Sequence, residues 1–401
     1  MKLKLVPIVA LLAAALASSA ALAQKKYDQG ASDKEILVGN INPYSGPASA
    51  YGTIGRSIAA YFKKVNEEGG VNGRQINMIS YDDGYSPPKT VEMARKLVEQ
   101  DKVLLIFQSL GTPPNSAIHK YMNAKKVPHL FVATGATKWN DPKQFPWTMG
   151  WQPDYQTEAK IYAQHILKEK PNAKIAVLYQ NDDYGKDYLK GFKDGLGAKA
   201  KTMIVKEASY EVSDPTVDSQ MAQLQASGAD TFFNITTPKF AAQAIRRTWD
   251  SGWKPQHYLN NVSASIGSTL KPAGLDKSVG LISTQYLKDQ NDKAWANDPA
   301  VVEWTAFMKK YYPDGSLLAT ENFYGWNVAQ TLVQVLKQSG NDLTRENVMK
   351  QAASLKNFVV PGLLPGIKIN TSATDFAPIE SVQLARFNGT DWVRFGEIMG
   401  K

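Results

Sequence analysis

The feature that most constrains the fold of this chain is a regular alternation of short apolar stretches with amphipathic stretches. Apolar stretches of strand length lie at 36–41, 76–81, 103–108 and 129–133. Between them, apolar residues recur at helical spacing, as in 54–65, which is typical of a helix that buries one face. Because strands separated by helices need crossover connections, the pattern predicts a parallel sheet with helices on both faces.

The alternation begins again near residue 157 and predicts a second unit of the same kind. Its expected strands are 174–179, 202–207 and 231–235, and its expected helices are 157–168, 184–196, 215–227 and 239–251. Gly195 and Gly197 follow one of these helix patterns, where a left-handed residue that ends the helix is expected. Two helix patterns, 301–312 and 322–338, and two strand-like segments, 382–387 and 392–395, come last. The sequence therefore predicts two α/β lobes that share a C-terminal segment.

The first 23 residues have the pattern of a secretory signal peptide. Lys2 and Lys4 precede the apolar run 5–16, and Ala21-Leu22-Ala23 supplies the small residues of a cleavage site. A transmembrane anchor is the alternative, but the run is shorter than the roughly 18 to 20 residues that span a bilayer. Since the chain has no cysteine, it has no residue for lipid attachment. We expect cleavage after residue 23 and a freely soluble protein in a bacterial periplasm.

Composition excludes several classes of function. The formal charge is +9, but the basic residues are interspersed with acidic ones and form no run, so nucleic acid is not expected as a partner. The absence of cysteine excludes disulfides, thiolate zinc sites and cysteine nucleophiles.

Motifs for catalysis and cofactor binding are also missing from the sequence. The four histidines occur singly, and there is no G-x-S-x-G, H-E-x-x-H or phosphate-binding G-x-x-x-x-G-K-[ST] motif. The acidic pairs Asp82-Asp83 and Asp182-Asp183 follow strand patterns and are better explained as turn caps than as metal ligands. We expect no enzyme activity, no cofactor and no metal.

The loops that follow the strands offer hydroxyl groups instead. Ser109-Leu110-Gly111-Thr112 lies between a strand pattern and a helix pattern, and the next strand pattern ends in Thr134-Gly135-Ala136-Thr137. Hydroxyls and free N–H groups at a helix N-terminus favour a carboxylate, although each loop is explained equally well by helix capping. Tyr51, Tyr184 and Trp326 could wall an apolar part of a ligand, with packing in the core as the alternative.

Several segments resemble one known family. They are Ser45-Gly46-Pro47 with Tyr51-Gly52, Asn66 to Arg74 (NEEGGVNGR), Tyr81-Asp82-Asp83 and Asp183-Tyr184-Gly185. With them the chain resembles, over nearly its whole mature length, the branched-chain amino acid (Leu/Ile/Val) type of periplasmic binding protein, the receptor component of ABC importers. The resemblance implies two Rossmann-like lobes joined by three crossovers, the type I fold of these proteins. We place the first lobe at 34–152 plus 286–355 and the second at 153–285 plus 356–401.

The resemblance also implies a ligand site between the lobes. Ser109 matches the family's hydroxyl for the ligand carboxylate, and Gly135 and Thr137 match the adjacent loop. Tyr51, Tyr184 and Trp326 match the aromatic wall. The expected ligand-binding set is Tyr51, Ser109, Leu110, Gly111, Thr112, Gly135, Thr137, Tyr184, Thr237, Ser263 and Trp326.

The sequence departs from the family's amino acid binders at one point. The segment Asn260 to Ala264 has no acid, although those binders carry one there for the ligand ammonium, and a buried polar group without a partner costs roughly 1–3 kcal/mol. Thr237 stands near a position where the family often has Tyr. The expected ligand is therefore a small carboxylate, either a branched-chain or related amino acid or an aromatic or aliphatic acid without an amine.

These observations predict a monomeric receptor that delivers its ligand to the membrane permease of an ABC importer. Two alternatives stay open at this point: an exported α/β enzyme that acts on a small carboxylate, and a sensory ligand-binding protein.

Overall fold

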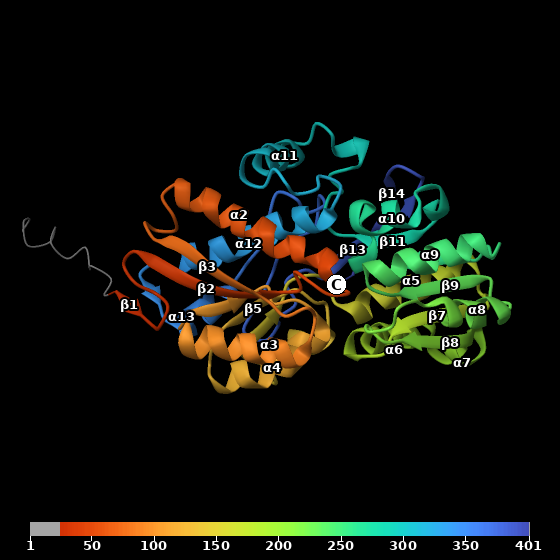
Figure 1. The fold of residues 1–401 in the computed structure, drawn as a ribbon, viewed down its shortest axis with the longest axis horizontal. Helices are drawn as coiled ribbons and strands as arrows, with labels where there is room; N and C mark the ends of the chain where they lie inside the picture. Colours follow the sequence, from red (N-terminus) through yellow and green to blue (C-terminus); the bar gives the residue numbers. More distant parts are fainter. Residues whose placement is uncertain (1–24, 401) are drawn as a thin grey trace, which may run out of the picture.

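The computed structural model describes residues 25–400 and folds them around two β-sheets (Figure 1). The strands of the first sheet are β2 (Glu35–Asn42), β3 (Gln75–Asp82), β4 (Leu105–Phe107), β5 (His129–Val132) and β6 (Thr148–Gly150). The strands of the second are β7 (Ile175–Gln180), β8 (Ile204–Tyr210), β9 (Thr231–Ile235), β10 (Gln256–Leu259), β11 (Ile282–Gln285), β13 (Ser381–Phe387) and β14 (Trp392–Gly400). The short strands β1 (Lys26–Tyr27) and β12 (Asp342–Leu343) pair separately.

The two sheets have the same parallel core. The first has the order β3-β2-β4-β5-β6, and five strands of the second repeat it as β8-β7-β9-β10-β11, with β13 and β14 added antiparallel at the β11 edge. Counted along the chain, both orders are 2-1-3-4-5, the doubly wound arrangement in which ligands bind at the carboxyl ends of the strands. The prediction of an α/β fold with two Rossmann-like lobes is confirmed.

Helices cover both sheets. The first sheet is covered by α2 (Thr53–Glu67), α3 (Pro87–Arg95) and α4 (Thr112–Ala124). The helices between β6 and β11 are α5 (Tyr155–Glu169), α6 (Asp183–Leu196), α7 (Ala200–Met203), α8 (Asp218–Ala226), α9 (Pro238–Asp250) and α10 (Lys271–Ala273). The last helices are α11 (Pro299–Tyr311), α12 (Thr320–Ser339) and α13 (Arg345–Ala352). α11 and α12 pack against α2, so the chain returns to the first sheet after β11.

Three segments connect the lobes, at 151–154, 286–298 and 353–380. We use "first lobe" for the elements packed on the first sheet, α11 to α13 included, and "second lobe" for those packed on the second. The residue boundaries proposed from the sequence stay a prediction.

Every strand expected from the sequence is present, but the two-residue strands β1 and β12 were missed, and so were three strands of the two sheets: β6, β10 and β11. The last three are only three or four residues long, and β10 (QHYL) and β11 (ISTQ) are rich in polar residues. Parallel strands buried on both faces are usually apolar runs, so these gave no strand signal. Apart from Gln256 at the start of β10, their polar side chains are nevertheless buried.

Close packing of α5 against α6 positions Tyr155 and Tyr184, two side chains of the candidate site described below. Gly197 ends α6 with φ of 58°, as expected, but Gly195 lies inside the helix. There Gly191 and Gly195 face the backbone of Gln156 and Lys160 on α5, and a Cβ on Gly191 would stand 2.3 Å from the Gln156 Cα. The contact fixes the two helices whose first turns carry Tyr155 and Tyr184.

Gly191→Ala is expected to lower the free energy of unfolding. Overpacking typically costs about 1–3 kcal/mol, which exceeds the roughly 1 kcal/mol that Ala gains over Gly in a helix. Chemical denaturation would measure the difference, with Lys186→Ala at an exposed position of the same helix as the matched control. Equal stability of Gly191→Ala and wild type would show that the two helices separate easily.

Candidate ligand-binding site

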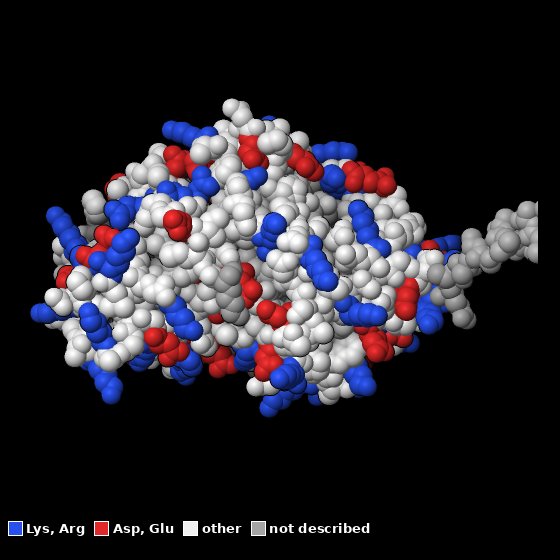
Figure 2. All heavy atoms as spheres, turned by 180° about the vertical axis from the view of Figure 1, so that it is seen from behind, with Lys and Arg blue, Asp and Glu red and all other residues white. Residues whose placement is uncertain are grey.

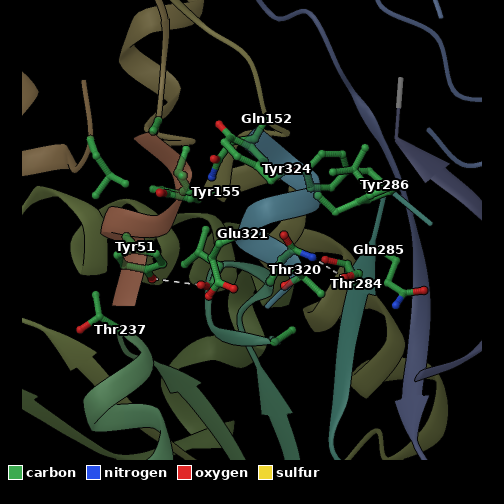
Figure 3. A pocket seen from close by; sticks show the side chains of 18 of the residues that line it. Tyr51, Gln152, Tyr155, Thr237, Thr284, Gln285, Tyr286, Thr320, Glu321 and Tyr324 are labelled. Atoms are coloured by element: carbon green, nitrogen blue, oxygen red, sulfur yellow. Dashed lines mark hydrogen bonds between the residues drawn. The ribbon is translucent and has the colours of Figure 1, made fainter. Parts of the chain in front are cut away.

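A cavity lies between the lobes, where the carboxyl ends of strands from both sheets face each other (Figure 3). It holds about 980 Å³ of empty space, part of it open to solvent. The first lobe contributes Tyr51 and Ile54 near the start of α2, Leu110 to Thr112 after β4, and Ala133 after β5. The second contributes Thr237 after β9, Asn261 and Val262 after β10, and Thr284 to Tyr286 at the end of β11. This size and position are typical of a site for a small molecule.

Aromatic rings form much of the wall. Tyr155 stacks on Tyr188 with ring centroids 4.3 Å apart and meets Tyr184 edge to face at 5.4 Å. On the other side, Tyr324 meets the ring of Trp151 edge to face at 5.2 Å. Tyr85, Tyr286, Phe323 and Trp392 complete the set of lining rings with Tyr51, Tyr155, Tyr184 and Tyr324. The wall suits an apolar or aromatic ligand body.

Two tyrosine hydroxyls are available as donors in the cavity. Asn260 Nδ2 donates to Tyr184 Oη at 2.7 Å, and Gln108 Nε2 donates to Tyr324 Oη at 3.1 Å. Since each hydroxyl accepts a hydrogen bond from an amide, its own proton is free for a ligand acceptor. Tyr51 differs, because its hydroxyl donates to Val262 O at 3.0 Å.

The start of α4 offers fewer backbone donors than the sequence suggested. Gly111 precedes the helix with φ of 99°, which brings its backbone to the cavity edge, and Thr112 follows as the first helical residue. Pro113 and Pro114 come next and have no N–H. Thr112 is therefore the one residue among the first three of α4 that can donate from its backbone.

Six of the eleven residues expected to bind ligand line the cavity: Tyr51, Leu110, Gly111, Thr112, Tyr184 and Thr237. The other five, Ser109, Gly135, Thr137, Ser263 and Trp326, do not line it.

Ser109 makes its contacts inside the first lobe. Its hydroxyl is hydrogen bonded to Asn115 Oδ1 and to the ring of His129, and all three residues are inaccessible to solvent. Burial lowers the pKa of His129 to about 3, so its ring is neutral. The expectation that Ser109 holds the ligand carboxylate therefore needs correction: its hydroxyl stabilises the β4–α4 loop.

Thr137 and Gly135 also make contacts within the protein. The Thr137 N–H and hydroxyl donate to Asp187 Oδ2, at 2.9 and 3.0 Å, from the opposite lobe. The Gly135 carbonyl accepts from Tyr155 N at 2.8 Å, and a Cβ on Gly135 would meet the Tyr155 ring. Gly135 thus makes room for a lining aromatic.

Ser263 and Trp326 point away from the cavity. The Ser263 hydroxyl donates to Thr236 O. Trp326 packs with Phe323 and Phe307 in a cluster between α12 and α11. Tyr324, two residues earlier on the helix, takes the lining position instead.

The sequence reasoning missed three charged residues in the lining: Lys288, Asp289 and Glu321. Figure 3 shows Glu321 in the middle of the group of labelled side chains. Its carboxylate accepts from Ser265 Oγ at 2.8 Å and from the Ser268 hydroxyl, and burial raises its pKa. Burial also raises the pKa of Asp289 to about 6. The segment Asn260 to Ala264 has no acid, but these two acids reach the lining from elsewhere in the chain.

The charge of Lys288 is balanced by an ion pair within the protein. Its Nζ lies 2.9 and 2.8 Å from the two carboxylate oxygens of Asp298, and both side chains are largely buried. A lysine engaged in this way is a weak partner for a ligand carboxylate.

Several hydrogen bonds join the two lobes around the cavity. Tyr51 reaches Val262, Thr137 reaches Asp187, and Ser265 reaches Glu321. Lys138 Nζ also forms an ion pair with Asp183 at 2.8 Å. The lobes are therefore in a closed arrangement.

Glu158 supports the cavity from behind. This buried carboxylate on α5 accepts hydrogen bonds from the Tyr162 and Tyr188 hydroxyls, each at 2.7 Å, and from Asn261 N at 2.8 Å. The bond to Asn261 fixes the loop after β10 that lines the cavity. Burial raises the pKa of Glu158 to about 7.

The surface seen in Figure 2 carries charges of both signs. On the face in Figure 2, Lys and Arg side chains are interspersed with Asp and Glu. Within residues 25–400 no cluster of three or more His, Asp or Glu could hold a metal ion. None of the helices in the same range is long and apolar enough to cross a membrane. The predicted signal peptide lies outside the described residues.

Comparison with known proteins agrees with this geometry. The chain is similar to the Leu/Ile/Val-binding protein homolog 1 of Brucella abortus (strain 2308), with 26% identity over 356 residues, covering 86% of this chain and 90% of that protein. Its fold is that of a branched chain amino acid ABC transporter protein from Thermus thermophilus with bound valine, at 17% identity and a TM-score of 0.82, covering 92% of this chain and 98% of that one.

A protein with a different ligand has the same fold. The fatty acid ABC transporter substrate-binding protein from Thermomonospora curvata matches with 22% identity and a TM-score of 0.79, covering 94% of this chain and 95% of that one. The model of the periplasmic binding protein family matches residues 35–391. The chain belongs to this family of solute-binding proteins.

The buried Glu158 is expected to make stability depend on pH. Its pKa of about 7 in the folded protein exceeds the ordinary 4.5, so the folded state binds the proton more tightly. Its contribution to the free energy of unfolding is complete below pH 4.5 and is lost as the pH rises through 7. The loss is at most about 3.5 kcal/mol, at about 1.4 kcal/mol for each of the 2.5 pH units between the two values.

Glu158→Gln should therefore flatten the fall in stability between pH 4.5 and 7, as measured by urea denaturation across that range. Glu169→Gln, at the exposed end of the same helix, is the control and should keep the wild-type slope. An unchanged slope in Glu158→Gln would mean that the carboxylate is hydrated in the folded protein.

Proposed function

We propose that this protein is the periplasmic receptor of an ABC importer and that it binds a small carboxylate ligand, amino acid or simple acid, between its lobes. The observation that carries the proposal is the cavity itself, which both lobes line and which hydrogen bonds between the lobes surround. The family supports a receptor that binds and releases a solute. Opening and closing of the lobes about the three connections would admit and release the ligand.

The contacts proposed for the carboxylate differ from those expected at first. The Thr112 N–H, the Tyr184 hydroxyl and the Tyr324 hydroxyl replace Ser109 and Thr137 as donors. Thr112 lies in the first turn of α4, where the helix dipole also favours an anion. Two phenolic donors and one amide can satisfy most of the acceptors of a carboxylate.

The partners proposed follow from the same function. Export by the predicted signal peptide places the receptor in the periplasm, where it acts as a monomer. The closed lobes would then present a joint surface to a membrane permease, which accepts the ligand. The fatty acid and valine proteins of this fold both belong to ABC transporters, which supports a permease partner.

A thermal-shift screen of the mature protein tests the proposal. We expect stabilisation by at least one of three groups: branched-chain amino acids, aromatic acids or aliphatic acids. A ligand at 100 times its Kd adds about 2.7 kcal/mol, which raises Tm by several degrees. No shift with any group, or conversion of a bound acid into product, would contradict a receptor for small carboxylates.

Tyr184→Phe tests the proposed carboxylate contact. A hydrogen bond to a charged group contributes about 1.5–3 kcal/mol, so loss of the hydroxyl should weaken the best ligand of that screen by roughly 10- to 100-fold. Calorimetric titration measures the change. Tyr179→Phe is the matched control, because Tyr179 is absent from the cavity lining. Equal loss in both variants would indicate a general effect on the second lobe.

A further inference from the structure

One short segment of the second lobe reaches across to the first lobe beside the cavity. It comprises residues 265–268, here called the strap, which follow β10 and include the start of the π-helical turn Ile266–Leu270. Ile266 and Leu270 bury their side chains in a cluster with residues of α9, β10, β13 and β14. The strap therefore moves with the second lobe. Its preceding residue, Ala264, lines the cavity.

The strap is hydrogen bonded to the first lobe at the start of α12. Gly267 N–H donates to Leu318 O at 3.0 Å, and Thr320 N–H donates to Ser265 Oγ at 3.3 Å. The Ser265 hydroxyl in turn donates to the Glu321 carboxylate at 2.8 Å. Because Glu321 lines the cavity, the contacts that join the two lobes here also complete the cavity wall.

Gly267 meets the first lobe with no room for a side chain. A Cβ at this position would stand 2.7 Å from Leu318 C and 2.8 Å from Leu318 O and Ala319 N. All three are backbone atoms, so no side-chain rotation would relieve the overlap. The φ angle of Gly267 is not positive, so the strap itself accepts an alanine. Only the approach of the opposite lobe excludes one.

The loop that receives the strap is held on its other side. Leu317 O accepts from Gln290 Nε2 at 3.2 Å, and Leu318 O accepts from Asn291 Nδ2 at 3.3 Å. Both donors belong to the second connection between the lobes. Since well-packed segments resist displacement, an added methyl group at the strap would be accommodated by separation of the lobes.

We propose that the strap is a closing stop: it binds the start of α12 only when the lobes close, and the glycine at 267 sets how closely they approach. The inference rests on the proposed function, because it concerns the closure that encloses the ligand. A side chain at 267 keeps the lobes apart, breaks the bonds to Glu321 and leaves the cavity open at this end. The atoms nearest to the added Cβ all belong to the first lobe, so each lobe folds as before.

Disulfide trapping of the empty protein tests the closing stop. The chain has no cysteine, so Ser116→Cys combined with Asp183→Cys introduces one possible intramolecular disulfide, between α4 and α6 of opposite lobes. Ser116 Oγ donates to Asp183 Oδ2 at 3.0 Å, which brings the two positions within reach of a disulfide when the lobes are closed. With copper phenanthroline as the oxidant, the bond forms only in molecules that close, even if closure is rare. Its rate, measured by non-reducing electrophoresis, is therefore proportional to the closed fraction.

Gly267→Ala in this double-cysteine parent should slow formation of the disulfide roughly tenfold or more, because it overpacks a close backbone contact. The urea midpoint of the reduced protein should not fall. Gly150→Ala is the matched control, since a Cβ there would meet no atom closer than 3.7 Å, and it should keep the parent rate. Ser265→Ala, which removes the hydroxyl shared by Thr320 and Glu321, should also slow the reaction and decides the question if Gly267→Ala does not fold.

An unchanged or faster reaction in Gly267→Ala would overturn the closing stop, and so would equal slowing by Gly150→Ala. A lower urea midpoint would show that Gly267 is needed inside its own lobe, which also contradicts the proposal. The assay contains no ligand, so these outcomes leave the receptor proposal intact. Absence of the disulfide in the parent itself would mean that the lobes do not close as described, and would count against both.

Discussion

The structure depends on one geometric constraint: all strands of a parallel sheet end at the same edge. In each lobe the order 2-1-3-4-5 brings the loops after the central strands together at that edge, and the three connections turn the two edges toward each other. Loops far apart in the sequence, such as those containing Leu110, Val262 and Tyr286, thereby meet in one cavity. The site is a consequence of the topology, and its chemistry depends on which side chains the loops carry. Because the topology does not fix the side chains of the loops, the same fold can occur in a protein with bound valine and in a fatty acid ABC transporter protein.

The sequence predicted the fold well because strand and helix patterns are local, whereas the site depends on contacts that are not. The loop 109–112 was correctly expected at a strand end, but only the partners of Ser109 reveal that its hydroxyl faces His129 and Asn115. Trp326 and Tyr324 differ by two positions, or about 200° around a helix, which turns one into the core and the other into the cavity. Glu321 gave no signal, since it lies in the first turn of a helix some 200 residues after the strands of the first sheet.

Buried acids are the main electrostatic feature of the site. Glu158, Asp289 and Glu321 come from α5, from the second connection and from α12, and burial raises the pKa of each. They differ in their partners: Glu158 is surrounded by two tyrosine hydroxyls and a backbone N–H, whereas Asp289 has a free oxygen. A fully paired carboxylate rigidifies its surroundings, and a partly paired one can accept a new donor. Glu158 therefore acts on the shape of the cavity.

The bonds from Thr137 to Asp187 and from Lys138 to Asp183 lie outside the cavity lining. Their free energy favours the closed lobes whether or not a solute is present, so these contacts raise the fraction of empty receptors that is closed. An importer that responds to closure alone would consume ATP on these empty receptors. A ligand shifts the balance only by the contacts it makes solely in the closed state. Stronger peripheral contacts would raise the affinity for the ligand, because they favour closure. They would also raise the amount of ATP that the transporter hydrolyses on closed but empty receptors.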